Sequence, residues 1–248
     1  MQEVFEEEDI PVAEFENIGL SKDGRIDLGE HDLKALLAGR RTAMLRLHNL
    51  EDGDVKIMHL DAKLSLRRNE QGNLDLMIHP VYREPEAPQY LTDNEAEKLA
   101  KGELVNLDKE VEINGVKKEV LIEFDKDTNE FVITDTERIL APDYVNNEEL
   151  TPEQKLRFKK GKEVELSDGT KFRFSATDPN GIRSNKLHLI ASLLIDGGLS
   201  YLLYQGLKAL NKEDKVSEDY SRGYYDALED MQVRQVKDRM KGQNVHSR

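Results

Sequence analysis

Three segments of the chain repeat one pattern, and this repeat limits the fold more than any other feature. Each opens with a leucine and has a glycine eleven residues later, in the pairs Leu28 and Gly39, Leu91 and Gly102, and Leu150 and Gly161. An alternating run with β-type residues follows each glycine. A period of about sixty residues predicts a tandem of small helix–strand–strand–strand units. One short helix can just bury one face of a three-stranded meander, and the packing of neighbouring units would bury more.

Capping residues place the helices at the start of each unit. Thr92 with Glu95, and Thr151 with Gln154, have the spacing of a capping box. Pro152 suits the first helical position. Gly102 and Gly161, which end the second and third of these helices, are expected to have a positive φ, because a Cβ would clash in the left-handed region.

Alternating residues and turn signals place the strands. The expected strands are 42–47, 55–60 with 63–67, and 73–79 in the first unit, 103–113, 116–124 and 131–134 in the second, and 162–166 and 170–177 in the third. Asn114-Gly115 is the strongest hairpin signal. The third strand of the third unit is missing or very short.

These elements predict an α+β protein of three repeated helix-plus-three-stranded-antiparallel-meander units followed by C-terminal helices. The expected organisation is an acidic N-terminal arm at 1–20, repeat unit 1 at 21–90, unit 2 at 91–149, a shortened unit 3 at 150–184 and a C-terminal helical segment at 185–248.

The most apolar stretch of the chain lies at 187–210, where we expect a helix. It is long enough to span a bilayer, which takes about 20 residues, but Asp196 falls near its centre beside Gly197-Gly198. Burial in a core or a subunit interface is favoured over a membrane helix, and self-association through 187–210 is one form of that burial. A second helix is expected at 217–241, with an apolar stripe that includes Tyr224 and Met231.

Composition excludes several classes of protein. The 248 residues carry a net charge of −14, which repels a phosphate backbone unless basic residues cluster on one face. The absence of cysteine excludes disulfides and cysteine-ligated zinc. The acidic first ten residues do not resemble a signal peptide. Local basic clusters occur at Arg40-Arg41, at Arg67-Arg68 and between Lys155 and Lys162 on the third unit's helix.

No motif indicates catalysis or a metal site. Asp125, Asp127 and Asn129 have the spacing of a calcium loop, but Glu130 stands where glycine is needed and the terminal acid is out of place. A polar turn between strands is favoured instead. The six histidines lack the spacing of metal ligands on one helix face. We therefore assign no catalytic, cofactor-binding or metal-ligating residue and no cofactor.

The repeated sequence motif resembles that of a tandem-repeat family of unknown function from conjugative and phage-like mobile elements of gut bacteria. The resemblance covers residues 18–180 and rests on the leucine-to-glycine motif followed by a β run with an Asn/Asp-Gly turn. It implies no activity and transfers no catalytic residue.

Two functions remain as hypotheses. The first is a non-enzymatic binding or scaffolding protein of a mobile element or phage, acting through protein–protein contacts in the bacterial cytoplasm or in a virion. The alternative is an accessory factor in DNA processing or transfer that binds nucleic acid or a DNA enzyme. A membrane partner is not expected.

Overall fold

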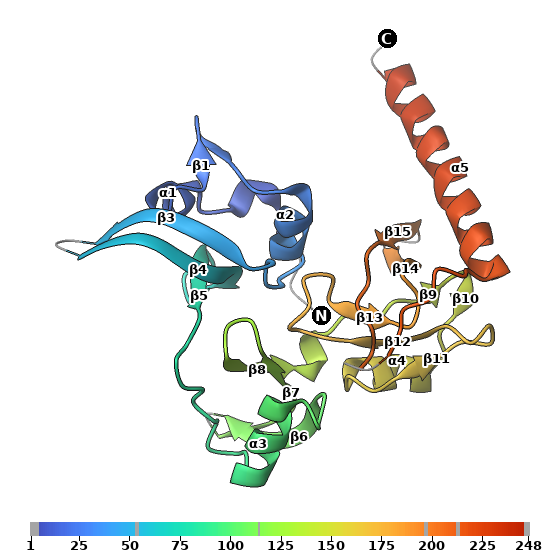
Figure 1. Cartoon of the computed structure of the whole chain (residues 1–248). Coiled ribbons are helices and arrows are strands. Elements are labelled where there is room, and N and C mark those ends of the chain that lie inside the picture. Colours follow the sequence, from blue (N-terminus) through green and yellow to red (C-terminus); the bar gives the residue numbers. More distant parts are fainter. Residues whose placement is uncertain (1–4, 53–54, 114, 196–197, 212–213, 246–248) are drawn as a thin grey trace. The chain divides into compact units, whose positions relative to one another are not determined.

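The computed structural model describes residues 5–52, 55–113, 115–195, 198–211 and 214–245 (Figure 1). The chain divides into two compact units, which are described separately. From here on, "unit" means one of these two parts, and each repeated segment of the sequence is called a repeat. The first unit consists of Met1–Leu140 and Phe174–Ile182, and the second of Ala141–Arg173 and Arg183–Arg248. The structure contains helices and several small antiparallel sheets, which confirms the predicted α+β class.

The first repeat contains a helix followed by a three-stranded meander, as predicted. These elements are α2 (Glu30–Leu37), β3 (Leu45–Asp52), β4 (Val55–Arg68) and β5 (Leu74–Pro80). The short strands β1 (Ser21–Lys22) and β2 (Arg25–Ile26) precede them, and the N-terminal arm forms η1 (Glu7–Asp9) and α1 (Val12–Asn17). One half of β4 pairs with β3 and the other half with β5. The acidic N-terminal segment docks on this sheet, because Phe5, Ile10 and Phe15 share one core with Leu36 and Leu64.

The second repeat has the same order of elements. It contains α3 (Asp93–Lys101), β6 (Leu107–Ile113), β7 (Val116–Asp125), β8 (Glu130–Asp135) and η2 (Thr136–Arg138). The predicted capping box of Thr92 and Glu95 is confirmed, and Gly102 ends α3 with φ 77°. Gly115 has a positive φ, whereas its predicted turn partner Asn114 lies outside the described residues. Leu99 packs on Val120 and Ile122 to form a small core.

A later segment of the chain completes the first unit. Phe174–Ile182 belongs to that unit although it follows the third helix in sequence. The buried Glu123 carboxylate accepts hydrogen bonds from Ser175 Oγ, at 2.9 Å, and from the Ala176 amide. Arg40 Nε donates to Pro179 O at 2.8 Å. The segment is thus bound to residues of both the first and the second repeat.

The second unit contains the third repeat and a separate sheet. Its elements are β9 (Tyr144–Val145), β10 (Glu148–Glu149), α4 (Pro152–Lys159), β11 (Val164–Glu165), β12 (Lys171–Phe174), β13 (Ile182–Ser184), β14 (Leu189–Ile195), β15 (Gly198–Tyr204) and α5 (Arg222–Val245). The capping box of Thr151 and Gln154 is confirmed, and Gly161 after α4 has φ 63°. Phe158 of α4 packs on Phe172 of β12. The third strand of this repeat is the three-residue β13.

The helix predicted at 187–210 is wrong. This stretch forms β14 and β15, which pair antiparallel from Leu189 opposite Tyr204 to Ile195 opposite Gly198. The sheet has the order β10-β9-β14-β15, so β14 is an inner strand. The residues from Leu189 to Ser192 are buried, whereas Leu194 is 56% exposed. Nearly all residues of β14 and β15 are apolar, so the sequence lacks the regular alternation that separates strands from helices. Asp196 and Gly197 lie outside the described residues.

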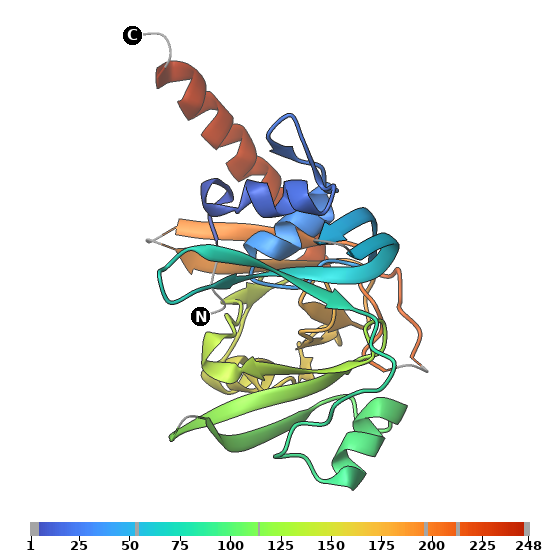
Figure 2. The same cartoon turned by 90° about the vertical axis from the view of Figure 1, so that its left-hand side faces the viewer.

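The final helix is confirmed as α5. Tyr224 and Ala227 pack against Ile190 of β14, and Met231 is also buried. Figures 1 and 2 show that only the first part of α5 lies beside β14 and β15, and the rest extends beyond their sheet. Among the described residues, no helix combines the length and the apolar character needed to cross a bilayer.

Candidate functional site

A buried ionic network joins the first two repeats. Lys63 of β4 places its Nζ 2.9 Å from both carboxylate oxygens of Asp125 and 2.9 Å from Asp127. The side chains of Lys63 and Asp125 are 1% and 2% exposed. The two aspartates of the calcium-like motif therefore bind an ammonium group. Asn129, the third residue of that motif, donates to the carbonyl oxygens of Tyr82 and Arg83.

Arg41 and Glu130 extend this network. Arg41 NH1 lies 2.5 Å from Glu130 Oε1 and 3.8 Å from Asp125 Oδ2. His79 Nδ1 lies 3.7 Å from the same Glu130 oxygen. Burial first, and then the charge of Arg41, lower the pKa of His79 from 6.5 to about 4. His79 is therefore neutral at pH 7.

Ser65, His79 and Glu130 form a contact chain in the order of a hydrolase triad. Ser65 Oγ lies 2.8 Å from His79 Nε2, and the two residues are diagonal neighbours on β4 and β5. A general base works best with a pKa near the operating pH, and His79 is far below it. Glu130 is bound to Arg41 and lies beyond hydrogen-bond distance of the imidazole. This arrangement does not supply an activated nucleophile.

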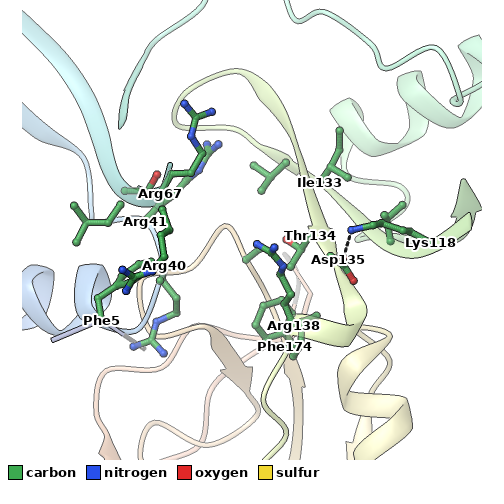
Figure 3. Close-up of a pocket in the computed structure, with 18 of the residues that line it drawn as sticks. Phe5, Arg40, Arg41, Arg67, Lys118, Ile133, Thr134, Asp135, Arg138 and Phe174 are labelled. Carbon is green, nitrogen blue, oxygen red and sulfur yellow. Dashed lines mark hydrogen bonds and ion pairs between the residues drawn. The ribbon is translucent and has the colours of Figure 1, made fainter. Parts of the chain in front are cut away.

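A basic pocket lies next to this network, within the first unit. It has a volume of about 690 Å³. Six basic side chains and one carboxylate line it, namely Arg40, Arg41, Arg67, Arg68, Lys118, Arg138 and Asp135. Figure 3 shows Arg40, Arg41 and Arg67 on one side of the pocket and Lys118 and Arg138 on the other.

Both repeats contribute to the pocket through ordinary features of their strands and turns. Arg40 and Arg41 directly follow Gly39, which has φ 66° and turns the chain away from α2. Lys63, Ser65 and Arg67 alternate along β4 and so share one face, opposite the face that carries Leu64 and its core. Their exposure increases along the strand, from the buried Lys63 to the exposed Arg67.

Asp135, the carboxylate among the described residues that line the pocket, is held in its charged form. Burial raises the pKa of Asp135, but the hydrogen bonds from Lys118 and the Glu137 amide, together with the charges of Lys118 and Arg138, outweigh burial and lower it. The Lys118 ammonium lies 2.9 Å from Asp135 Oδ2 (Figure 3). Lys118 is thereby neutralised, as Arg41 is by Glu130.

Two arginines of the pocket have no such carboxylate. Arg67 and Arg138 are exposed, and neither forms an ion pair with any residue that the structure describes. Arg68 lies 3.6 Å from Asp9 and over the ring of Phe5, with its guanidinium 5.7 Å from the ring centroid. The pocket therefore carries excess positive charge.

Sequence reasoning found part of this pocket. The clusters Arg40-Arg41 and Arg67-Arg68 were noted, and the structure brings them together. The third basic cluster has local partners in the second unit, since Lys155 pairs with Asp143 at 2.5 Å and Arg157 donates to Glu163 O. Lys118 and Arg138 were missed because single basic residues in a charged sequence carry no signal. Within the described part of the chain, no group of His, Asp and Glu is arranged to hold a metal ion.

Comparison with known proteins finds a match that covers part of the chain. Residues 5–90 match the model of the family described as "Protein of unknown function (DUF4099)". This match spans the elements from η1 to β5, which include the Arg40, Arg41, Arg67 and Arg68 side of the pocket. No curated protein and no solved structure is significantly similar to the chain.

Proposed function

We propose that this protein is a non-enzymatic binding protein whose first unit binds a ligand carrying several phosphate groups. One observation carries the proposal: six basic side chains from two repeats line one pocket of a chain whose net charge is −14. The net negative charge of the chain repels anions from most of its surface. Basic side chains gathered in one pocket of such a chain therefore indicate a local anion-binding site.

The basic residues of the pocket suit phosphate groups. Five of the six basic residues are arginines, whose planar guanidinium groups bind phosphate through two parallel hydrogen bonds. Arg67 and Arg138 are available for such contacts, because neither is engaged by a carboxylate of the described residues. An acidic peptide would present carboxylates to the same arginines and is an alternative outcome of the experiment below.

This proposal favours the second of the two functions expected from sequence. A phosphate-binding pocket suits an accessory factor in the DNA processing or transfer of a conjugative or phage-like element, acting in the bacterial cytoplasm. The resemblance of the repeated sequence motif to proteins of such elements supports this setting, and the match to a family of unknown function adds no activity to it.

Calorimetric titration with inorganic tripolyphosphate tests the proposal. We expect saturable binding to the full chain, weakened roughly tenfold by Arg67→Ala or Arg138→Ala, because each removes one charge-assisted contact of about 1.5 kcal/mol. Arg25→Ala is the matched control, since Arg25 is an exposed arginine of the same unit outside the pocket. Equal affinity in all three variants, or binding of a poly-glutamate peptide but not tripolyphosphate, would contradict the proposal.

A second candidate function, self-association, rests on β15. This strand lies at the edge of its sheet and has no charged residue, whereas every other edge strand that the structure describes has at least one. Natural edge strands are usually protected by charges, and an uncharged one pairs readily with another strand. A second copy of the chain supplies a matching uncharged edge, in an antiparallel β15–β15 pair with two-fold symmetry.

Sedimentation analysis separates this candidate from a monomer. Leu202 of β15 is 40% exposed, and Leu202→Lys should convert a dimer to a monomer. Leu156→Lys on α4 of the same unit, where the leucine is 53% exposed, should leave the mass unchanged. A monomeric wild-type chain at high concentration would exclude self-association through this edge.

A further inference from the structure

We infer that the ligand of the basic pocket is one strand of a nucleic acid, held by its sugar–phosphate backbone without reading of the bases. This inference rests on the proposed function and specifies the ligand of the same site. It is carried by the size of the pocket, by the arrangement of its basic residues on two sides, and by the burial of its aromatic side chains.

The size of the pocket sets the length of strand that it can hold. A volume of about 690 Å³ equals a cube about 9 Å on a side. A single strand has one phosphate per roughly 3.4 Å of rise, so a stretch of that length presents about two or three phosphates. This number matches the two arginines without carboxylate partners, Arg67 and Arg138, with Arg40 beside them.

The basic residues come from both sides of the pocket. Arg40 and Arg67 belong to the first repeat, and Arg138 belongs to η2 of the second (Figure 3). A backbone that passes between them meets positive charge on either side. This arrangement suits a linear polyanion. The three-residue η2 is too short for its N-terminus to form an anion site, so the positive charge comes from the side chains.

The aromatic residues of the pocket are not available for stacking on bases. Phe5 and Phe174 line the pocket but are only 4% and 3% exposed. The Phe5 ring is moreover covered by the guanidinium of Arg68. Single-strand binders that hold bases do so on exposed aromatic faces. Contact here is therefore expected with the phosphates and sugars, independent of sequence.

Fluorescence anisotropy with labelled oligonucleotides tests the inference on the full chain. The probes are a ten-residue oligo-dT, the same strand made of abasic residues, the corresponding RNA, and a ten-base-pair duplex with blunt ends. We expect the three single strands to bind with equal affinity within about threefold, and the duplex to bind at least tenfold more weakly. Binding of the single strands should fall about 16-fold between 50 and 200 mM salt, from a slope of about −2 for three phosphates.

Variants assign this binding to the pocket. Arg67→Ala should lower single-strand affinity roughly tenfold and make the salt slope shallower by about 0.7, the loss of one phosphate contact. Arg25→Ala should change neither quantity. Its position outside the pocket makes it a control for net charge.

The oligonucleotide and tripolyphosphate experiments together show whether the inference alone fails or the proposed function fails with it. Tighter binding of the duplex, or a large loss on the abasic strand, overturns the inference. Binding of tripolyphosphate that depends on Arg67, without binding of any oligonucleotide, overturns the inference and leaves the proposed function standing. Absence of binding to every phosphate probe overturns both.

Discussion

Substitution of Lys63 by methionine should strongly destabilise the first unit. The methionine keeps most of the apolar stem but removes the ammonium group from Asp125, whose side chain is 2% exposed. Leaving one member of a buried pair without its partner costs about 3–5 kcal/mol. Arg41 lies 3.8 Å from the same carboxylate and offsets part of this loss, so we expect about 3 kcal/mol.

The effect is large enough to measure by thermal unfolding followed by circular dichroism. For a unit of about 150 residues, each 1 kcal/mol shifts the melting temperature by about 2–4 °C, so Lys63→Met should lower it by about 6–12 °C. The double variant with Asp125→Asn should recover a large part of this shift, because the uncompensated charge is gone. Lys117→Met, which breaks the exposed Lys117–Glu110 pair, should leave the melting temperature unchanged.

A shift smaller than about 2 °C for Lys63→Met would refute this reasoning. Equal shifts in the single and double variants would also refute it, because they would show that the loss comes from packing and not from the charge of Asp125.

Two further substitutions test other parts of the first unit. Because the pKa of His79 is lowered from 6.5 to about 4, the unfolded chain binds this proton first as the pH falls, and stability is lost between those two values. The loss of unfolding free energy is on the order of 2 kcal/mol after allowance for partial exposure of His79. Urea unfolding between pH 4 and 7 measures this loss. His79→Gln should abolish the pH dependence, whereas His59→Gln, at an exposed histidine, should leave it unchanged. Gly102→Val should destabilise by about 1–2 kcal/mol in the same assay, since φ at Gly102 is +77°, while Gly29→Ala, at φ −61° with open space around it, should have little effect. A flat pH profile in the wild type, or equal effects of the two glycine changes, would count against these assignments.

Local signals in the sequence predicted the local structure well. The capping boxes at Thr92 and Thr151 and the stop at Gly102 each depend on residues a few positions apart, and all three are present. The helix–strand–strand–strand order of the first two repeats follows from such signals. The segment 187–210 failed for the opposite reason: β14 and β15 are almost wholly apolar, so no regular alternation of polar residues reveals a period of two.

The candidate site could be predicted only in part, because it depends on contacts between distant residues. Lys63 and Asp125 are 62 residues apart, and nothing near either residue indicates the other. The basic pairs at Arg40 and Arg67 were visible in sequence, but their position in one pocket depends on the packing of two repeats. The role of Glu123 was invisible as well, since its donors come from a third repeat that follows it by 52 residues.

The discontinuity of the first unit has a consequence for how the chain is made. A ribosome that has synthesised the first two repeats has not yet made Ser175 and Ala176, the donors to the buried Glu123 carboxylate. At roughly 5–20 residues per second, residues 141–182 take about 2–8 s more. During that interval the nascent unit is unfinished and has a polar opening where the segment will dock. A gene fragment that stops after Leu140 would fix the protein in that unfinished state.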